Sequence, residues 1–241
     1  LTYLLMRQMA GSKLASCIAA GLVLLDNALL IESRFILVDT ILLFFGFLSL
    51  LLFLVVMRHR TASKTWMIFL PLAGIALGAT VSTKWTGVGM LGLVGLVALI
   101  DLAKSAWGSN RQFIQKLIGY AICLVGIPAF VYFGIWLVHF ELLPNSGPGD
   151  VFMTPEFRVS LNGSQGSMGD PLSIYDKVIE LNRTMYRSNS GIQAEHPWQS
   201  QWWTWPFIPR GISFWESRTD SNVARVYLLG VPYLWWLVSM G

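Results

Sequence analysis

The chain has 241 residues, of which 54% are hydrophobic and only 12% are charged, whereas about 25% of the residues of a soluble domain are charged. This composition excludes an ordinary soluble protein, and the net charge of +4 comes without the aromatic and basic patch that binds nucleic acid. The two cysteines lie in apolar segments and support neither a disulfide framework nor a metal cluster. We expect an all-α polytopic membrane protein with no metal site and no evident cofactor, and its metal dependence is left open.

Apolar runs long enough to cross a bilayer, about 20 residues each, follow one another along the chain. They cover residues 14–31, 35–57, 66–81, 86–103 and 117–139, and a further run begins near residue 226. The third run is short and contains Pro71 and Gly74, which predicts a tilt or a kink. The predicted parts are transmembrane helices over 1–139, an extracytoplasmic loop over 140–225 and the truncated start of a further transmembrane helix over 226–241.

Positive charges predict the orientation, because Lys and Arg are enriched in cytoplasmic loops. The basic connections precede the first run and follow the second and fourth runs, with Arg7, Lys13, Arg58, Arg60, Lys64, Lys104, Arg111 and Lys116. The turns on the opposite side carry only Arg34 and Lys84. We therefore expect the side of Arg34, Lys84 and the loop 140–225 to be extracytoplasmic.

Two local patterns predict further helices and their contacts. Residues 171–187 place apolar side chains at near-helical spacing, which predicts an amphipathic helix on the membrane surface. Residues 89–95 place glycines along one helix, which favours close helix packing over nucleotide binding. Sequons begin at Asn162 and Asn182 and matter only in a glycosylating compartment.

Ionisable residues interrupt the first two apolar runs at Asp26, Glu32, Arg34 and Asp39. A charge at the bilayer centre costs about 2.5–3.5 kcal/mol on insertion scales, so such residues usually face a partner or a water-filled cavity. Arg34 stands at the outer end of its run, where a guanidinium can bind a lipid phosphate through two parallel hydrogen bonds. Snorkelling, or an ion pair with Glu32 or Asp39, is the alternative.

Two further segments on the outer side carry candidate binding residues. Lys84, beside Trp85, is a second outer cation that would stabilise a departing phosphate, although Lys and Trp are also ordinary interface anchors. The tract 196–210, HPWQSQWWTWPFIPR, combines aromatic rings with His196 and other polar residues. It fits a sugar-binding or acceptor-binding surface or, alternatively, an interfacial aromatic belt.

Four strings occur together in a fixed order: LDNALLIESRFILVDTILLFF (25–45), STKWTG (82–87), FMTPEF (152–157) and HPWQSQWWTWPFIPR (196–210). In this combination the chain resembles the protein O-mannosyltransferase family, whose members have a GT-C-like transmembrane helix bundle. The resemblance implies transfer of mannose from a polyprenyl (dolichyl-type) phosphate to Ser or Thr hydroxyls of proteins outside the cytoplasm. It also implies an extracytoplasmic loop that carries short amphipathic helices.

The resemblance assigns roles to single residues. Arg34 is similar to the family's donor-phosphate arginine, and Lys84 would assist it. The residues that would support this site are Glu32, Asp39 and Asp26. The residues that would line the sugar or the acceptor are His196, Trp202, Trp203 and Trp205. The implied partners are membrane lipid, the lipid-linked donor and secreted or membrane proteins, and an oligomer is compatible with the resemblance.

The chain departs from the family pattern in two ways. The family's catalytic pair, Asp-Glu in the first outer loop, has no counterpart, because no two acids are adjacent in this sequence. We expect that pair upstream of residue 1, which would make the chain a fragment that is inactive alone. The loop 140–225 is short beside the MIR-containing loop of the eukaryotic enzymes, which favours a bacterial-like branch and the plasma membrane, with the endoplasmic reticulum membrane as the alternative.

Two other functions remain open from the sequence. A secondary transporter or channel could use Arg34, Asp39 and Asp26 as an ion or substrate relay, although the inverted repeats typical of transporters are not evident. A related GT-C transferase could instead use a lipid or a glycan as its acceptor.

Overall fold

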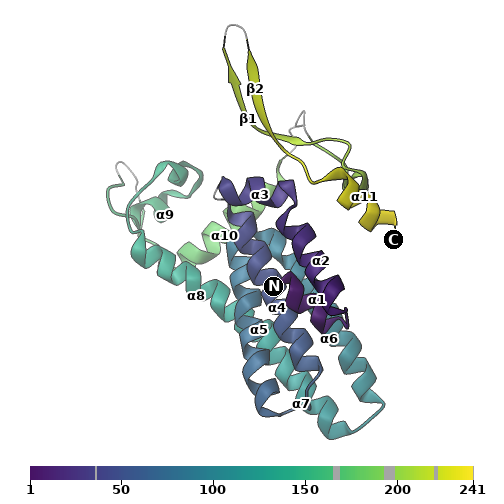
Figure 1. Cartoon of the computed structure of the whole chain (residues 1–241). Helices are drawn as coiled ribbons and strands as arrows, with labels where there is room; N and C mark the ends of the chain where they lie inside the picture. Colours follow the sequence, from purple (N-terminus) through teal and green to yellow (C-terminus); the bar gives the residue numbers. More distant parts are fainter. Residues whose placement is uncertain (36, 165–168, 193–198, 220–221, 241) are drawn as a thin grey trace. The chain divides into compact units, whose positions relative to one another are not determined.

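The computed structural model describes residues 1–35, 37–164, 169–192, 199–219 and 222–240. The chain divides into two compact units, of which unit 1 comprises Leu1–Pro128 and Glu195–Gly241 and unit 2 comprises Ala129–Ala194. Figure 1 shows that most of the described chain is helical, in agreement with the expected fold class. Each unit is described by itself below.

Unit 1 contains the N-terminal helices and the C-terminal hairpin. Its helical elements before the boundary are α1 (Thr2–Gln8), α2 (Lys13–Leu24), α3 (Asn27–Arg34), α4 (Val38–Met57), α5 (Lys64–Thr83), η1 (Trp85–Gly87), α6 (Val88–Ala106), α7 (Asn110–Tyr120), the π-helical turn η2 (Ala121–Gly126) and the start of α8 (Ile127–Leu142). Its C-terminal elements are η4 (Trp202–Phe207), β1 (Ile212–Arg218), β2 (Val223–Leu228) and α11 (Pro232–Met240).

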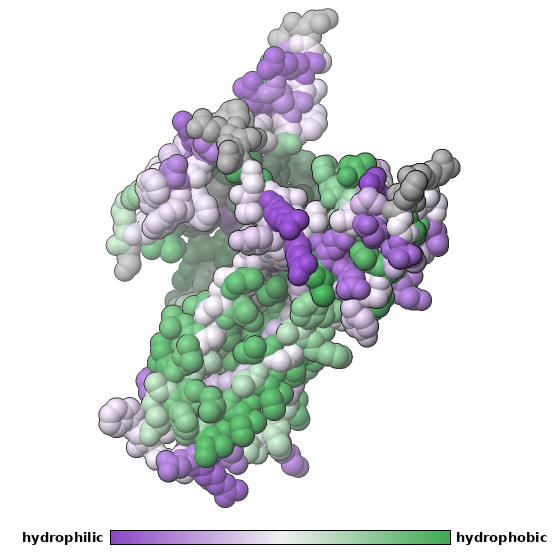
Figure 2. Space-filling view, turned by 180° about the vertical axis from the view of Figure 1, so that it is seen from behind, coloured by the Kyte–Doolittle hydropathy of each residue, from purple (hydrophilic) through white to green (hydrophobic). Residues whose placement is uncertain are grey.

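Four helical segments are long and apolar enough to cross a membrane. They are Val38–Met57, Lys64–Thr83, Trp85–Ala106 and Asn110–Leu142, and they match the second to fifth expected runs. The first expected run, 14–31, is instead broken into α2 and α3, which meet at a 52° bend. Figure 2 shows a broad apolar surface over the helix bundle of unit 1, with hydrophilic residues at its end, as an integral membrane protein requires.

The helices of unit 1 pack around a core of large apolar side chains. Its fully buried members include Phe53, Leu70, Leu77 and Val94. α5 passes through Pro71 as one continuous helix and approaches η2 so closely that a Cβ added at Gly74 would stand 1.9 Å from the carbonyl oxygen of Cys123. This contact fixes α5 against η2 backbone to backbone.

The packing prediction for residues 89–95 is wrong for the described part of the chain. A Cβ added at Gly89, Gly92 or Gly95 would meet no heavy atom within 4 Å. The glycine face of α6 therefore points into open space, and the close approach is made by Gly74 on α5. The sequence pattern identified small residues correctly but could not tell which helix face meets a neighbour.

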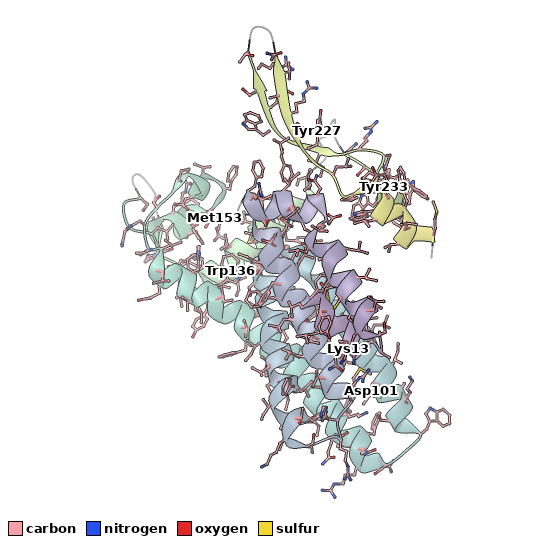
Figure 3. The ribbon with its side chains drawn as sticks, viewed as in Figure 1. Lys13, Asp101, Trp136, Met153, Tyr227 and Tyr233 are labelled. Atoms are coloured by element: carbon pink, nitrogen blue, oxygen red, sulfur yellow. The ribbon has the colours of Figure 1, made fainter. Side chains whose placement is uncertain are left out.

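A polar cluster joins α6 to α7 inside unit 1. Lys116 forms an ion pair of 2.7 Å with Asp101 and donates a hydrogen bond of 2.9 Å to Ser105. Tyr120 donates a hydrogen bond of 2.7 Å to the same carboxylate. Figure 3 labels Asp101 on α6. Because Asp101 and Lys116 are both largely buried, their mutual pairing removes the cost of two uncompensated charges.

The end of unit 1 is a β-hairpin followed by a short helix. β1 and β2 pair antiparallel, with a register shift between Ser213 and Trp215, so residues 223–228 form a strand and the last helix begins at Pro232 rather than near 226. On the hairpin surface, hydrogen bonds from Arg218 and then from Arg225 lower the pKa of the Glu216 carboxyl.

Unit 2 contains the rest of α8, η3 (Pro148–Phe152), α9 (Pro155–Val159) and α10 (Ile174–Ser190). Its core contains Phe140, Met153, Phe157, Leu161 and Val178, with Trp136 packed against it; Figure 3 labels Met153 and Trp136. The amphipathic helix predicted over 171–187 is α10, capped by the Ser173 side chain, which accepts a hydrogen bond from the backbone amide of Asp176. Its location on the membrane surface stays a prediction.

Candidate functional site

Asp26 is a buried helix cap. One of its carboxylate oxygens accepts hydrogen bonds from the backbone amides of Ala28 and Leu29, at 3.0 and 3.4 Å, which explains why α3 begins at Asn27 and why the expected first span is broken. The other oxygen accepts from the backbone amide of Val231 at 3.2 Å and from the indole of Trp235 at 3.1 Å. Asp26 is 7% exposed, so the structure gives it an anchoring position between α3 and α11.

Asp39 and Lys84 form an ion pair at one end of the bundle. Lys84 Nζ lies 2.8 Å from Asp39 Oδ1. Asp39 occupies the first turn of α4, where the helix dipole stabilises a negative charge, and Lys84 directly follows α5. The side chains are 28% and 45% exposed, so solvent reaches the pair, and a pair of this kind contributes about 0–1 kcal/mol of stability.

Glu32 completes this cluster. Its carboxyl has a raised pKa, first because of burial, then because of the negative charge of Asp39, while Lys84 acts in the opposite direction. Glu32 therefore lies close enough to both residues to respond to their charges. Three of the residues predicted from the sequence are thus gathered at the junction of α3, α4 and α5.

Arg34 lies at the end of α3, two residues after Glu32. It stands in the last helical turn, where a cation interacts favourably with the helix dipole, and it is exposed. Among the residues that the structure describes, it forms no hydrogen bond or ion pair with Glu32, Asp39 or any other group. The ion-pair alternative is therefore not seen in the described part of the chain, and the guanidinium is open to a ligand.

The aromatic tract lies on η4 as a set of exposed rings. Trp202, Trp203 and Trp205 are each more than half exposed, and the first two pack edge to face with ring centres 5.6 Å apart. Trp205 donates its indole hydrogen to Ser200 at 3.2 Å. The predicted site residue His196 lies outside the described residues.

Helix α11 connects the aromatic tract to α3. Trp235 bonds to Asp26, as above, and the neighbouring Trp236 donates to the backbone carbonyl of Phe207 at 3.0 Å. Asn27 adds a hydrogen bond of 3.0 Å to the carbonyl of Leu229. Trp235 and Trp236 could not be assigned to the site from the sequence, because they lie within an apolar run. Their polar indole groups were the only available signal.

A second contact links α3 to the hairpin. The ring of Phe35, which follows Arg34, packs edge to face on Phe214 of β1, with 5.6 Å between ring centres. The hairpin thus fixes the segment that carries the free guanidinium. Within the described ranges, no group of three or more His, Cys, Asp or Glu residues could hold a metal ion.

Comparison with known proteins finds matches over most of the chain. The sequence profile described as dolichyl-phosphate-mannose-protein mannosyltransferase matches residues 1–144, and the C-terminal four-transmembrane region of protein O-mannosyltransferase matches residues 174–241. Protein O-mannosyltransferase 1 of Drosophila melanogaster is 34% identical over 192 residues, which are 77% of this chain and 22% of that protein.

Two yeast proteins give the same result. Dolichyl-phosphate-mannose–protein mannosyltransferase 3 of Saccharomyces cerevisiae is 32% identical over 70% of this chain and 23% of its own length. A solved structure of the S. cerevisiae protein O-mannosyltransferase Pmt1–Pmt2 complex bound to the sugar donor matches 68% of this chain and 23% of that chain, with a TM-score of 0.65 and 26% identity. This chain therefore spans less than a quarter of these relatives, and it belongs to the dolichyl-phosphate-mannose–protein mannosyltransferase family.

Proposed function

We propose that this chain is part of a membrane mannosyltransferase that moves mannose from a polyprenyl or dolichyl phosphate to Ser or Thr hydroxyls of proteins on the extracytoplasmic side. The observation that carries the proposal is the exposed guanidinium of Arg34, which has no partner among the described residues. It stands at the end of α3, next to the cluster of Glu32, Asp39 and Lys84.

In this reaction the acceptor oxygen forms a bond to the anomeric carbon of mannose, and the bond from that carbon to the phosphate oxygen breaks. The leaving lipid phosphate gains negative charge, which fixed cations stabilise. Arg34 can bind two phosphate oxygens at once, and Lys84 would add a second positive charge. Asp39 holds the Lys84 ammonium in place through the 2.8 Å contact, so we assign Asp39 and Glu32 to positioning.

The acceptor hydroxyl must also lose its proton to a base, and a carboxylate is suited to this step. We assign Asp26 to anchoring α11, because all four of its hydrogen bonds hold α3 or α11. The exposed rings of Trp202, Trp203 and Trp205 would contact the CH surface of mannose or the acceptor, together with His196.

The family relationship does not favour a transporter or channel. A transferase with a lipid or glycan acceptor differs from this proposal only in the second substrate. We further propose the plasma membrane as the location, with the endoplasmic reticulum membrane as the alternative. Association with a second subunit is also proposed, because the solved relative is a Pmt1–Pmt2 complex.

The test is transfer of labelled mannose from polyprenyl-phosphate mannose to a Ser/Thr peptide by the full-length protein. Arg34→Ala should lower the rate on the order of a hundredfold or more, as loss of one charge-stabilising donor does. Arg111→Ala is the matched control, because Arg111 is also exposed and lies at the start of α7, in a predicted cytoplasmic connection. Equal rates for Arg34→Ala and the wild type would overturn the assignment.

A further inference from the structure

Helix α10 of unit 2 carries two arginines whose side chains form no hydrogen bond or ion pair among the described residues. The helix has five charged side chains, three of which make contacts in the described structure. Asp176 accepts a hydrogen bond from Ser173 at 2.6 Å, Glu180 accepts two from Thr154 at 2.8 and 2.9 Å, and Lys177 lies 5.1 Å from the ring centre of Phe140.

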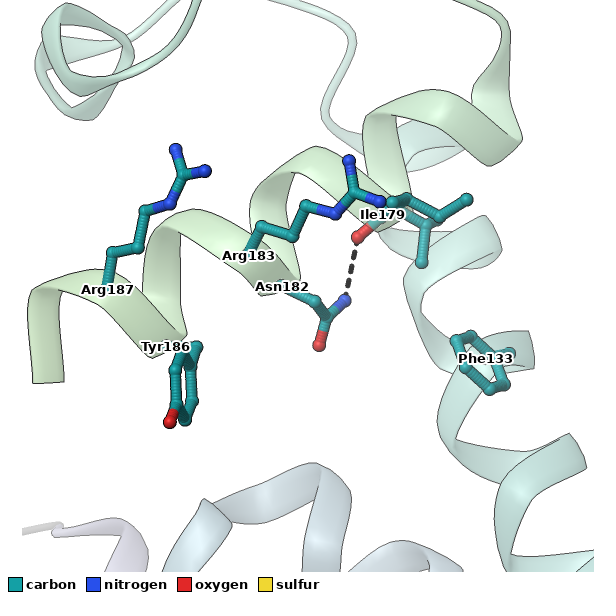
Figure 4. A pocket seen from close by; sticks show the side chains of 7 residues that line it. Phe133, Ile179, Asn182, Arg183, Tyr186 and Arg187 are labelled. Carbon is teal, nitrogen blue, oxygen red and sulfur yellow. Dashed lines mark hydrogen bonds between the residues drawn. The ribbon is translucent and has the colours of Figure 1, made fainter. Parts of the chain in front are cut away.

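The remaining two are Arg183 and Arg187. Both are exposed, and neither forms a hydrogen bond or an ion pair through its side chain with any residue in the described ranges. They are four residues apart, so they are neighbours on one face of the helix. Figure 4 shows both guanidinium groups projecting from the same side of α10. The helix dipole favours a cation in the last turn, where Arg187 lies, but it explains neither Arg183 nor the surface around both arginines.

That surface is a hollow with apolar walls. It has a volume of about 400 Å³ and is lined by both arginines together with Phe133, Val178, Ile179, Asn182 and Tyr186. Among the residues that the structure describes, none of those that line it is acidic. A second hollow of about 350 Å³ on α10 shares the arginines but is also lined by Asp176 and Glu180, so an anion is better accommodated in the first.

The apolar wall continues along a predicted membrane span. Phe133 belongs to α8, which is part of the candidate span Asn110–Leu142, and it is 52% exposed. Phe130 and Val138, also on the unit 2 part of α8, are exposed as well. Tyr132 of α8 donates a hydrogen bond to the side chain of Asn182, which fixes α10 beside this span within unit 2. Positive charge thus lies next to an apolar strip of membrane-spanning helix.

We propose that Arg183 and Arg187 bind the phosphate of an anionic glycerophospholipid, whose acyl chains lie along Phe133 and the exposed strip of α8. Guanidinium groups bind phosphate oxygens with charge-assisted hydrogen bonds, and basic residues at a membrane surface favour anionic lipids. The apolar wall selects a lipid over a free phosphate, because it adds the burial of acyl chains. This site is independent of the donor site proposed at Arg34.

The hydrogen bonds of the Asn182 side chain also bear on the sequon that begins at this residue, because both of its amide groups are occupied in the folded chain. The Asn182 amide nitrogen donates to the backbone carbonyl of Val178 at 2.8 Å, and its oxygen accepts from Tyr132. Asn182 is therefore a wall of the hollow rather than a free glycan acceptor.

The test uses the full-length protein in phosphatidylcholine nanodiscs doped with a photo-cross-linkable phosphatidylglycerol. Cross-links to the peptides of α10 and α8 are measured against the lipid fraction. Each arginine should contribute about fivefold to the apparent affinity for phosphatidylglycerol. R183Q/R187Q should therefore raise the fraction of phosphatidylglycerol that gives half-maximal cross-linking by roughly 25-fold. K177Q, which removes one charge from the same helix outside the hollow, should leave it nearly unchanged.

Several results would overturn the proposal. One is an unchanged half-saturating fraction in R183Q/R187Q, and another is an equal shift in K177Q, which would indicate general charge attraction. Competition by inorganic phosphate at equal concentration would assign the site to a free anion, and competition by an acidic peptide would assign it to a protein. Stronger competition by farnesyl phosphate would assign it to the sugar donor.

Discussion

Replacing Asp26 with Ala separates an anchoring role from a catalytic one. Asp26 accepts two hydrogen bonds from the start of α3 and two from Val231 and Trp235 at the start of α11. Loss of a helix cap costs about 1 kcal/mol. Val231 and Trp235 would each lose a hydrogen bond, and because Trp235 is 41% exposed the ordinary net value of about 0.5–1.5 kcal/mol per bond applies. We therefore expect Asp26→Ala to lower the stability of the C-terminal region by roughly 2–4 kcal/mol.

Asp26→Asn and Gly230→Ala test the same link from both sides. Asn keeps an oxygen for the cap but turns an NH₂ group toward the α11 donors, so its effect should be intermediate. A Cβ at Gly230 would stand 2.2 Å from the indole nitrogen of Trp235, which displaces that ring from Asp26. Asp26→Ala and Gly230→Ala both break the hydrogen bond between Asp26 and Trp235. The double variant Asp26→Ala/Gly230→Ala should therefore lose less stability than the sum of the losses in the two single variants.

The assay is hydrogen exchange of the peptides covering α3 and α11 in detergent, together with mannose transfer measured at several temperatures. Gly92→Ala is the control, because its added Cβ meets nothing within 4 Å. The anchoring account predicts faster exchange in both helices and a recovery of transfer when the temperature is lowered. Unchanged exchange combined with lost transfer would refute it and would return Asp26 to the functional cluster predicted from the sequence.

Three further outcomes follow from the packing, the hairpin and the aromatic tract. Gly74→Ala should destabilise unit 1 by about 2 kcal/mol or more, because its Cβ would overlap a carbonyl oxygen at 1.9 Å. Gly95→Ala should be neutral or stabilising by up to about 1 kcal/mol. Thermal unfolding in detergent measures both effects. Two arginines lower the pKa of the Glu216 carboxyl. Its contribution to the stability of the hairpin is therefore complete above its unfolded pKa of about 4.3 and is lost as the pH falls through the folded pKa. Hydrogen exchange of the hairpin should become faster over this pH range, and Glu216→Gln should abolish this pH dependence. Trp203→Ala should raise the KM for donor or acceptor with little change in thermal stability, because the ring is 56% exposed; an unchanged KM would favour the aromatic belt.

The membrane helices could be predicted because each depends on a single local property. An apolar run of about 20 residues suffices for a span, and four of the expected runs correspond to the helices Val38–Met57, Lys64–Thr83, Trp85–Ala106 and Asn110–Leu142. The bend before α3 was not predicted, although Asp26 makes the cap that begins α3 with its close neighbours Ala28 and Leu29. What the sequence could not show is the second half of the contact, because Val231 and Trp235 are more than two hundred positions away.

Other features required knowledge of which helix faces meet. Arg34, Asp39 and Lys84 were identified as site residues, but the sequence left Arg34 with Glu32 or Asp39 as alternative partners, whereas the structure pairs Asp39 with Lys84. The hairpin over 212–228 was assigned to the loop 140–225 and, from residue 226, to the start of a transmembrane helix, because two short strands show no long apolar run. The hollow on α10 could not be predicted either, because the sequence pattern indicates the helix but not which of its charged side chains make contacts among the described residues.

The central claim is that Arg34 holds the phosphate of the lipid-linked donor, and binding of a short-chain polyprenyl phosphate to the full-length protein tests it most directly. Dissociation constants in detergent should be compared for the wild type, Arg34→Ala and the control Arg111→Ala. Hydrogen bonds to a charged group contribute about 1.5–3 kcal/mol, so Arg34→Ala should bind roughly tenfold to a hundredfold more weakly, while the control should match the wild type. Equal dissociation constants for Arg34→Ala and the wild type would contradict the account.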